Sequence, residues 1–233
     1  MSLATGFAIA ATVSALAAIA ADWNERRHFT FYVLKPLTTL FIIGLAATVP
    51  EGGARTLMLL ALVLSLAGDI CLMFAGDTAP SRNHLPKQDT ASASSGQGWF
   101  IGGLGSFLLA HLAFIPALLY GVQSPSLPMW SAGLVLWGLA FFAWLLPKTG
   151  PLKIAVLVYG TILLGMALAA IARWNVAPSE SSRLALAGAL LFVVSDSSLS
   201  VRKFVGPYMG AQALILSTYW TAIGLMAYSL TLA

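Results

Sequence analysis

The sequence predicts an all-α, polytopic membrane protein, a bundle of about eight transmembrane helices. Of its 233 residues, 59% are hydrophobic and only 9% are charged, whereas an ordinary soluble domain is about 25% charged. The mean hydropathy is +0.87. The apolar residues are gathered into long runs of about 20 residues, the length that crosses a bilayer. We therefore expect a single transmembrane domain over residues 1–233.

The basic residues do not indicate a nucleic-acid partner, although the formal net charge is +4. They stand singly or in pairs between apolar runs, as in the loops of membrane proteins. The single cysteine, Cys71, lies inside an apolar run, where plain packing is its expected role. The partner that composition predicts is the lipid bilayer, and the oligomeric state is not readable from it.

The first half of the chain contains three apolar runs and one polar segment. The runs cover about Met1 to Ala21, Thr30 to Val49 and Thr56 to Phe74. The segment 76–98 is rich in small and polar residues, which predicts a mobile polar loop.

The second half is expected to cross the membrane five times. Between Thr90 and Pro147 there is no Asp, Glu, Lys or Arg, which is too long for one span and fits two. The five predicted spans cover about 99–120, 129–146, 152–172, 184–201 and 207–232. An even total of eight places both termini on one side of the membrane.

The loop charges predict the orientation. The first, third, fifth and seventh connections hold eight Lys and Arg residues, and the other three connections hold three, with Lys35 inside a span. Because cytoplasmic loops are enriched in Lys and Arg, the odd connections are expected in the cytoplasm and both termini outside.

Four ionisable residues interrupt the apolar runs: Lys35, Asp69, His111 and Asp196. Charge inside a bilayer is costly, so such residues are functional candidates by default. Lys35, Asp69 and Asp196 lie about five residues from the odd-connection ends of their spans, or roughly 7 to 8 Å. Tyr159 is expected at a similar depth and His111 and Tyr219 deeper. This agreement predicts one polar cavity entered from the cytoplasmic leaflet.

Each of these residues also has a structural interpretation. The two aspartates could pack the bundle through hydrogen bonds or an ion pair with Lys35, Lys35 alone could snorkel to the headgroups, and His111 could be a buried, hydrogen-bonded histidine. His111, Asp69 and Asp196 could also ligate a metal. Only one histidine lies inside a span and no CxxC is present, so no metal site is predicted.

Several segments resemble the YhhN family of bacterial and eukaryotic membrane lysoplasmalogenases. They run in the family's order from the second span to the last, and the long 76–98 segment departs from the family's short turn. The segments are LKPLTTL (34–40), LSLAGDICLM (64–73), FIGGLGSFLLAHLAFI (100–115), YGTILLGM (159–166), GALLFVVSDSSLSVRKF (188–204) and STYWTAIGL (217–225).

The resemblance implies a hydrolase that cleaves the vinyl ether of lysoplasmalogen to a fatty aldehyde and glycerophosphoethanolamine or glycerophosphocholine, without a known cofactor. It implies an integral membrane location, which we expect to be a bacterial inner (plasma) membrane. The family's polar positions fall on Lys35, Asp69, His111, Tyr159, Asp196 and Tyr219.

A catalytic scheme follows from these residues. We expect one aspartate to act as the general acid, and the other, kept ionised by Lys35, to act as the stabilising anion and base. His111 and Tyr159 would orient water. The expected substrate contacts are Tyr219, Thr39, Arg202 and Lys203, the last two placed to attract the phosphate of a lysophospholipid. The alternatives are a proton-coupled transporter of a small amphiphile and a metal-dependent lipid amidase.

Overall fold

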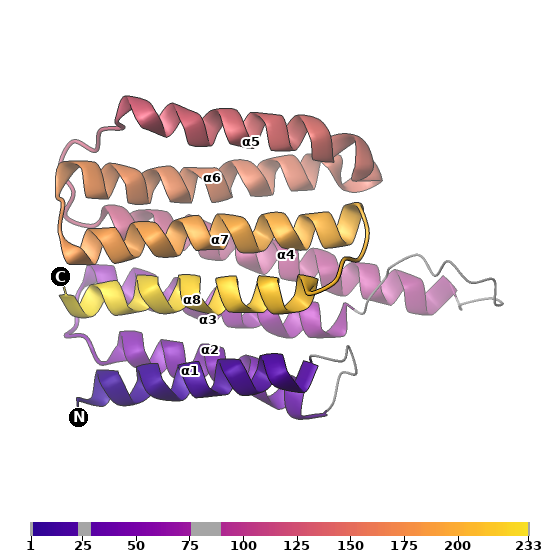
Figure 1. The fold of residues 1–233 in the computed structure, drawn as a ribbon, viewed down its shortest axis with the longest axis horizontal. Coiled ribbons are helices and arrows are strands. Elements are labelled where there is room, and N and C mark those ends of the chain that lie inside the picture. Colours follow the sequence, from indigo (N-terminus) through magenta and orange to yellow (C-terminus); the bar gives the residue numbers. More distant parts are fainter. Residues whose placement is uncertain (1, 23–28, 76–89, 233) are drawn as a thin grey trace.

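The protein is a bundle of eight long helices (Figure 1). The computed structural model describes residues 2–22, 29–75 and 90–232, and these contain no strand. All eight helical segments are long and apolar enough to cross a membrane, which confirms the predicted fold class. They are α1 (Leu3–Asp22), α2 (Phe29–Ala47), α3 (Gly53–Phe74), α4 (Thr90–Leu119), α5 (Ala132–Leu145), α6 (Lys153–Val176), α7 (Glu180–Phe204) and α8 (Ala211–Ser229).

Four short 3₁₀ turns lengthen three of these helices. Met129–Ser131 precedes α5, Leu146–Lys148 follows it, Gly150–Leu152 precedes α6 and Leu230–Leu232 follows α8. With its two turns, the fifth span covers 20 residues, Met129–Lys148. That length is enough to cross the hydrocarbon core.

The helices run side by side along one axis, and both termini lie at the same end of the bundle (Figure 1). Successive helices form tightly packed pairs, α1 with α2, α3 with α4 and α7 with α8. Helix α8 also contacts α1 and α2, and α4 packs against α6. Helix α5 lies at the edge of the bundle, where its main helical neighbour is α6.

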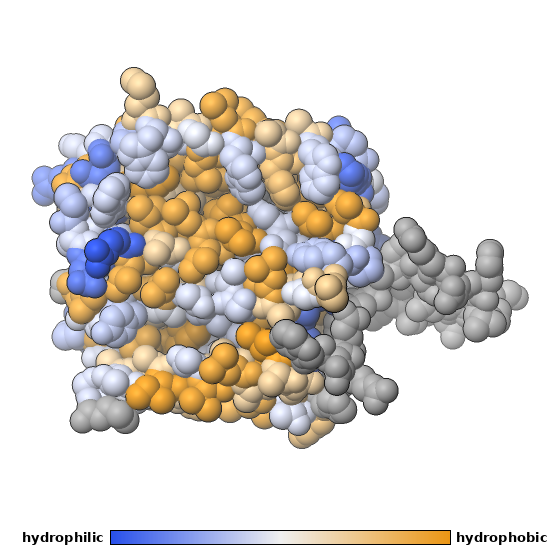
Figure 2. Space-filling model, in the orientation of Figure 1, coloured by the Kyte–Doolittle hydropathy of each residue, from blue (hydrophilic) through white to orange (hydrophobic). Residues whose placement is uncertain are grey.

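The outer surface suits a hydrocarbon solvent. Figure 2 shows apolar residues along the middle of the visible face and hydrophilic ones gathered at its two ends. Large apolar side chains such as Leu16, Val63 and Leu136 are more than half exposed. In water such a surface would be a liability, whereas in lipid it is the expected one. The chain is an integral, multi-pass membrane protein.

Two helices begin earlier than hydropathy predicts. Helix α7 starts at Glu180 rather than near Leu184, because the Ser179 side chain accepts a hydrogen bond from the backbone N–H of Ser182 and caps the helix. Helix α4 starts at Thr90, inside the predicted loop 76–98, through an alanine- and serine-rich stretch that permits helix outside the apolar run. Residues 76–89 of that predicted loop lie outside the described residues.

Candidate active site within the membrane

The first polar cluster surrounds Asp69 on α3. Its carboxylate is 2% exposed and accepts hydrogen bonds on Oδ2 from the hydroxyls of Thr39 and Tyr219, each at 2.8 Å. The Lys35 Nζ lies 3.5 Å from Asp69 Oδ1. These partners come from α2 and α8, so three helices converge on one carboxylate. The predicted contact between Lys35 and an aspartate is present, and Lys35 is buried rather than reaching for the membrane surface.

The sequence of α2 explains how it supplies two of these partners. Lys35 and Thr39 are four residues apart, so they lie on the same helix face. Pro36 removes one backbone donor from the first half of this helix. On a neighbouring face, Thr38 donates to Ser14 of α1 at 2.8 Å and thereby ties α1 to the same polar stretch.

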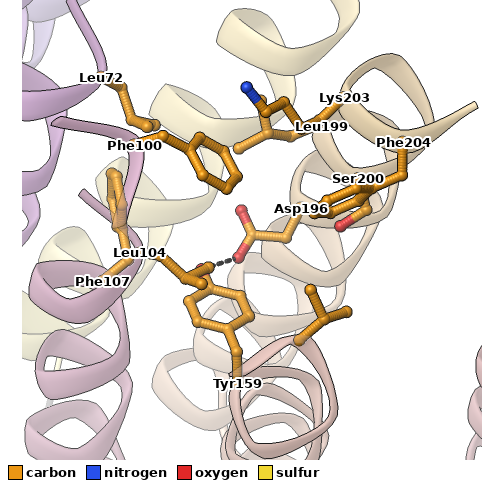
Figure 3. Close-up of a pocket in the computed structure, with 11 residues that line it drawn as sticks. Leu72, Phe100, Leu104, Phe107, Tyr159, Asp196, Leu199, Ser200, Lys203 and Phe204 are labelled. Carbon is orange, nitrogen blue, oxygen red and sulfur yellow. Dashed lines mark hydrogen bonds between the residues drawn. The ribbon is translucent and has the colours of Figure 1, made fainter. Parts of the chain in front are cut away.

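The second polar cluster surrounds Asp196 on α7. The Tyr159 hydroxyl, from α6, donates a hydrogen bond to Asp196 Oδ2 (Figure 3). The His111 Nε2, from α4, lies 3.9 Å from the same oxygen, which is beyond hydrogen-bond distance. His111 is fully buried, and no described atom forms a hydrogen bond with its Nε2. Catalytic hydrogen bonds are often long before substrate binds, so this geometry keeps His111 a candidate.

The side chains of Phe107 and Phe192, which we name the aromatic wall, lie between the two clusters. The Tyr219 ring packs edge-on against Phe107 and Phe192, with centroids 5.6 and 5.5 Å apart. The His111 ring packs against Phe192 at 4.7 Å and against Tyr159 at 5.3 Å. The six polar residues predicted from the sequence therefore meet inside one bundle, but as two adjoining clusters with this wall between them.

Asp196 faces an apolar pocket, which we name the Lys203 pocket. It is narrow and opens to the surface of the bundle. Figure 3 shows the Asp196 carboxylate beneath Phe100, with Tyr159 on one side and Lys203 on the other. The Lys203 Nζ lies 4.4 Å from the Phe100 ring centroid, a cation–π distance. The pocket is lined by Leu72, Phe100, Leu104, Phe107, Val156, Tyr159, Asp196, Leu199, Ser200, Lys203 and Phe204.

The structure separates the two basic residues that the sequence places together. Lys203 lines the pocket, whereas the Arg202 guanidinium donates a hydrogen bond to Gln212 of α8. Arg202 is not among the residues that line this pocket, so its predicted contact with a phosphate stays a prediction.

Sequence reasoning missed the aromatic residues of the site. Phe107 and Phe192 look like ordinary apolar residues of a span, and only their spacing carries a signal. Each lies four residues before a polar site residue, His111 and Asp196 respectively, and so shares its helix face. Nothing in one sequence distinguishes that spacing from core packing.

The His, Cys, Asp and Glu side chains of the described residues are not arranged as a metal site. Within residues 2–22, 29–75 and 90–232 there is no group of three His, Cys, Asp or Glu side chains placed to hold an ion. Asp69 and His111, which the sequence offered as possible ligands, belong to different clusters. Metal ligation needs at least three such donors around one point.

Fold and site define a class of protein: a polytopic helical membrane protein with two hydrogen-bonded carboxylates buried at membrane depth. The chain belongs to the YhhN family, whose model matches residues 30–230. This confirms the resemblance in the motif segments.

Curated relatives are named as lysoplasmalogenases. Lysoplasmalogenase TMEM86A of Bos taurus is 34% identical over 57% of this chain and 56% of its own length, and the human TMEM86A gives the same values. Human lysoplasmalogenase TMEM86B is 27% identical over 82% of this chain and 70% of its own. The match thus spans little more than half the length of the TMEM86A relatives. No solved structure matches the chain.

Proposed function

We propose that this protein is a lysoplasmalogenase-like ether hydrolase, which uses water to cleave the vinyl ether of lysoplasmalogen to a fatty aldehyde and glycerophosphoethanolamine or glycerophosphocholine. One observation carries the proposal: Asp196, a buried carboxyl hydrogen-bonded to Tyr159, forms the wall of an apolar pocket that also holds Lys203. Such a pocket suits an amphiphile with a phosphate and an apolar chain. Membership of the YhhN family and the names of the relatives support the same reaction class.

The reaction needs one proton donor, one water molecule and a negative charge near the developing cation. Protonation of the vinyl carbon beta to oxygen moves the π electrons into the new C–H bond and leaves an oxocarbenium ion. Water adds to the cationic carbon and releases a proton, which gives a hemiacetal. The hemiacetal then passes its hydroxyl proton to the ether oxygen as the C–O bond breaks, and aldehyde and alcohol leave.

The different surroundings of the two aspartates suggest a different catalytic role for each. Asp69 is held by Lys35 and by two hydroxyl donors, all of which favour its ionised form, so it is assigned the fixed anion. Asp196 borders the apolar pocket and is assigned the general acid, which takes a proton back when water adds. His111, beside Asp196, is placed to orient that water.

The test is aldehyde release by the purified protein from lysoplasmenylethanolamine, followed with a coupled dehydrogenase, with and without a chelator. Asp196→Asn is expected to lower kcat by about 10² to 10⁴, the range that general acid catalysis contributes. Glu180→Gln, the same chemical change at an exposed helix end, is the matched control and should retain full activity.

Three outcomes would contradict the proposal. A folded Asp196→Asn variant with near-normal turnover would remove the general acid. Chelator-sensitive release of a fatty acid from an amide would indicate the amidase, and movement of substrate across vesicles without any aldehyde would indicate the transporter.

A further inference from the structure

A second apolar opening reaches the Tyr159–Asp196 pair from the other side of α6. It lies between α5, α6 and α7, and both Tyr159 and Asp196 belong to its lining as well as to that of the Lys203 pocket. We name it the chain groove and define it by its apolar lining residues Trp137, Phe142, Leu163, Leu164 and Val193. Of the described side chains that line it, only Asp196 is charged.

The two openings extend to different depths. Lys203 follows Asp196 by seven residues along α7, which places it about 10 Å nearer the end of that helix. Val193 lies almost one turn in the opposite direction. Leu163 and Leu164 lie four and five residues beyond Tyr159 along α6, also toward the middle of the bundle. The two openings share Val156 and Ser200 near the helix ends, but the chain groove reaches further toward the middle of the membrane and the Lys203 pocket reaches further toward its surface.

We infer that the chain groove holds the alkenyl chain of the substrate and that Trp137 and Leu164 set the chain length it accepts. This inference rests on the proposed function. In a lysoplasmalogen the phosphate, the vinyl ether and the hydrocarbon chain follow one another. Along the protein, the cation of Lys203, the carboxyl of Asp196 and the apolar groove follow one another in the same order. A chain laid in this way points into the bilayer core, where a lipid chain already lies.

Glycines shape the floor of the groove. A Cβ on Gly138 would lie 2.4 Å from Leu164 Cδ1, and one on Gly160 would lie 2.5 Å from Phe142 Cζ. The side chains of Leu164 and Phe142 therefore occupy space that only a glycine leaves open, Leu164 against α5 and Phe142 against α6. Trp137 is 43% exposed, lies next to Gly138 on α5 and lines the same groove. Substitutions at Trp137 and Leu164 should change the length of the groove and leave the carboxyl in place.

The test measures kcat/KM for a series of lysoplasmalogens whose alkenyl chains differ by two methylene groups. Trp137→Ala should move the preference to longer chains, by about fourfold for each additional methylene group that the groove accepts. Leu164→Trp should reduce turnover of long chains and spare short ones. Leu136→Ala is the matched control, because Leu136 is the exposed neighbour of Trp137 and does not line the groove.

A binding measurement separates failure of the inference from failure of the proposed function. The probe is the saturated alkyl series of the same lysolipids, which lack the vinyl double bond and cannot be hydrolysed by this route. Aldehyde release with an unchanged chain-length profile in both groove variants would overturn the inference and leave the function standing. If no aldehyde forms, the proposed function fails. In that case, a chain-length profile of binding that shifts in both variants would still support the inferred role of the chain groove. An unchanged binding profile would overturn that inference as well.

Discussion

The two buried carboxylates differ in what surrounds them, and this difference decides what each can do. Asp69 has a cation and two hydroxyl donors around it and borders neither opening. Asp196 has one tyrosine donor and borders both openings. A carboxyl that transfers a proton must reach the substrate, whereas a carboxylate that supplies a field needs only to stay ionised. Asp69 is therefore expected to matter for stability as well as for catalysis.

Removing Lys35 should be costly, and removing both members of its pair should be much less so. Lys35→Met leaves the Asp69 carboxylate buried without its cation, which costs about 3 to 5 kcal/mol in comparable buried pairs. Adding Asp69→Asn to that variant removes the uncompensated charge, so the double variant should recover most of the free energy of unfolding. Unfolding in mixed detergent micelles measures both. If the double variant is less stable than Lys35→Met, Asp69 is not held as an anion.

The two tyrosines should respond differently to loss of the hydroxyl. Tyr159→Phe removes the hydroxyl that donates to Asp196 at the pocket wall and should lower kcat by about 10² or more, comparable to loss of one transition-state donor. Tyr219→Phe leaves Asp69 with Thr39 and Lys35 and should have the smaller effect on kcat. Steady-state kinetics with lysoplasmenylethanolamine compares the pair, and circular dichroism checks folding. A larger loss in Tyr219→Phe would move the reacting centre to Asp69.

At the scale of helices, close contact between α7 and α8 positions both clusters, because Asp196 lies on one helix and Tyr219 on the other. A Cβ on Gly188 of α7 would lie 2.7 Å from the backbone oxygen of Ala222 on α8. Since that neighbour is backbone, it can yield only if a helix moves. Small residues at such crossings let membrane helices approach closely.

Gly188→Ala should therefore destabilise the protein by about 1 to 3 kcal/mol, the usual cost of overpacking. It should also reduce activity, because moving α8 displaces Tyr219. Gly224→Ala on α8 is the matched control, since a Cβ added at Gly224 would meet open space within the described part of the chain. That change should be neutral or slightly stabilising, because alanine favours helix. Thermal unfolding in detergent compares the two, and equal melting temperatures would show that this crossing has room.

Helix count was predictable from the sequence, and helix ends and site partners were less so. Long apolar runs fix the spans because each must be about as long as the hydrocarbon core is thick. Their ends depend on caps such as Ser179 and on helix that continues into water, as at Thr90. Lys35 and Asp69 stood out because charge is rare in spans. Which tyrosine serves which aspartate depends on which helices touch, and a single sequence does not contain that information.

At the scale of the whole molecule, the charges are distributed unevenly between the two ends of the bundle. The connection from α5 to α6 holds Lys148, helix α6 begins at Lys153, and the end of α7 carries Arg202 and Lys203. The opposite end carries Arg55 and Arg173, with Arg183 in the first turn of α7. The Lys203 pocket lies nearer this end, which among the described residues is the richer in basic side chains. Under the proposed function, the orientation in the membrane decides which leaflet supplies the lipid.

Labelling of single introduced cysteines with a membrane-impermeant thiol reagent tests this orientation on intact cells. Met209, between α7 and α8, is 99% exposed, and Gln123, between α4 and α5, is exposed at the opposite end. The positive-inside rule predicts that Gln123→Cys is labelled from outside and that Met209→Cys is labelled only after permeabilisation. Both are made in a Cys71→Ala background, which is itself the unlabelled control. Labelling of Met209→Cys on intact cells would reverse the orientation and move the pocket mouth to the outer leaflet. The chemistry at Asp196 would remain as proposed, but its lipid would have to come from outside the cell.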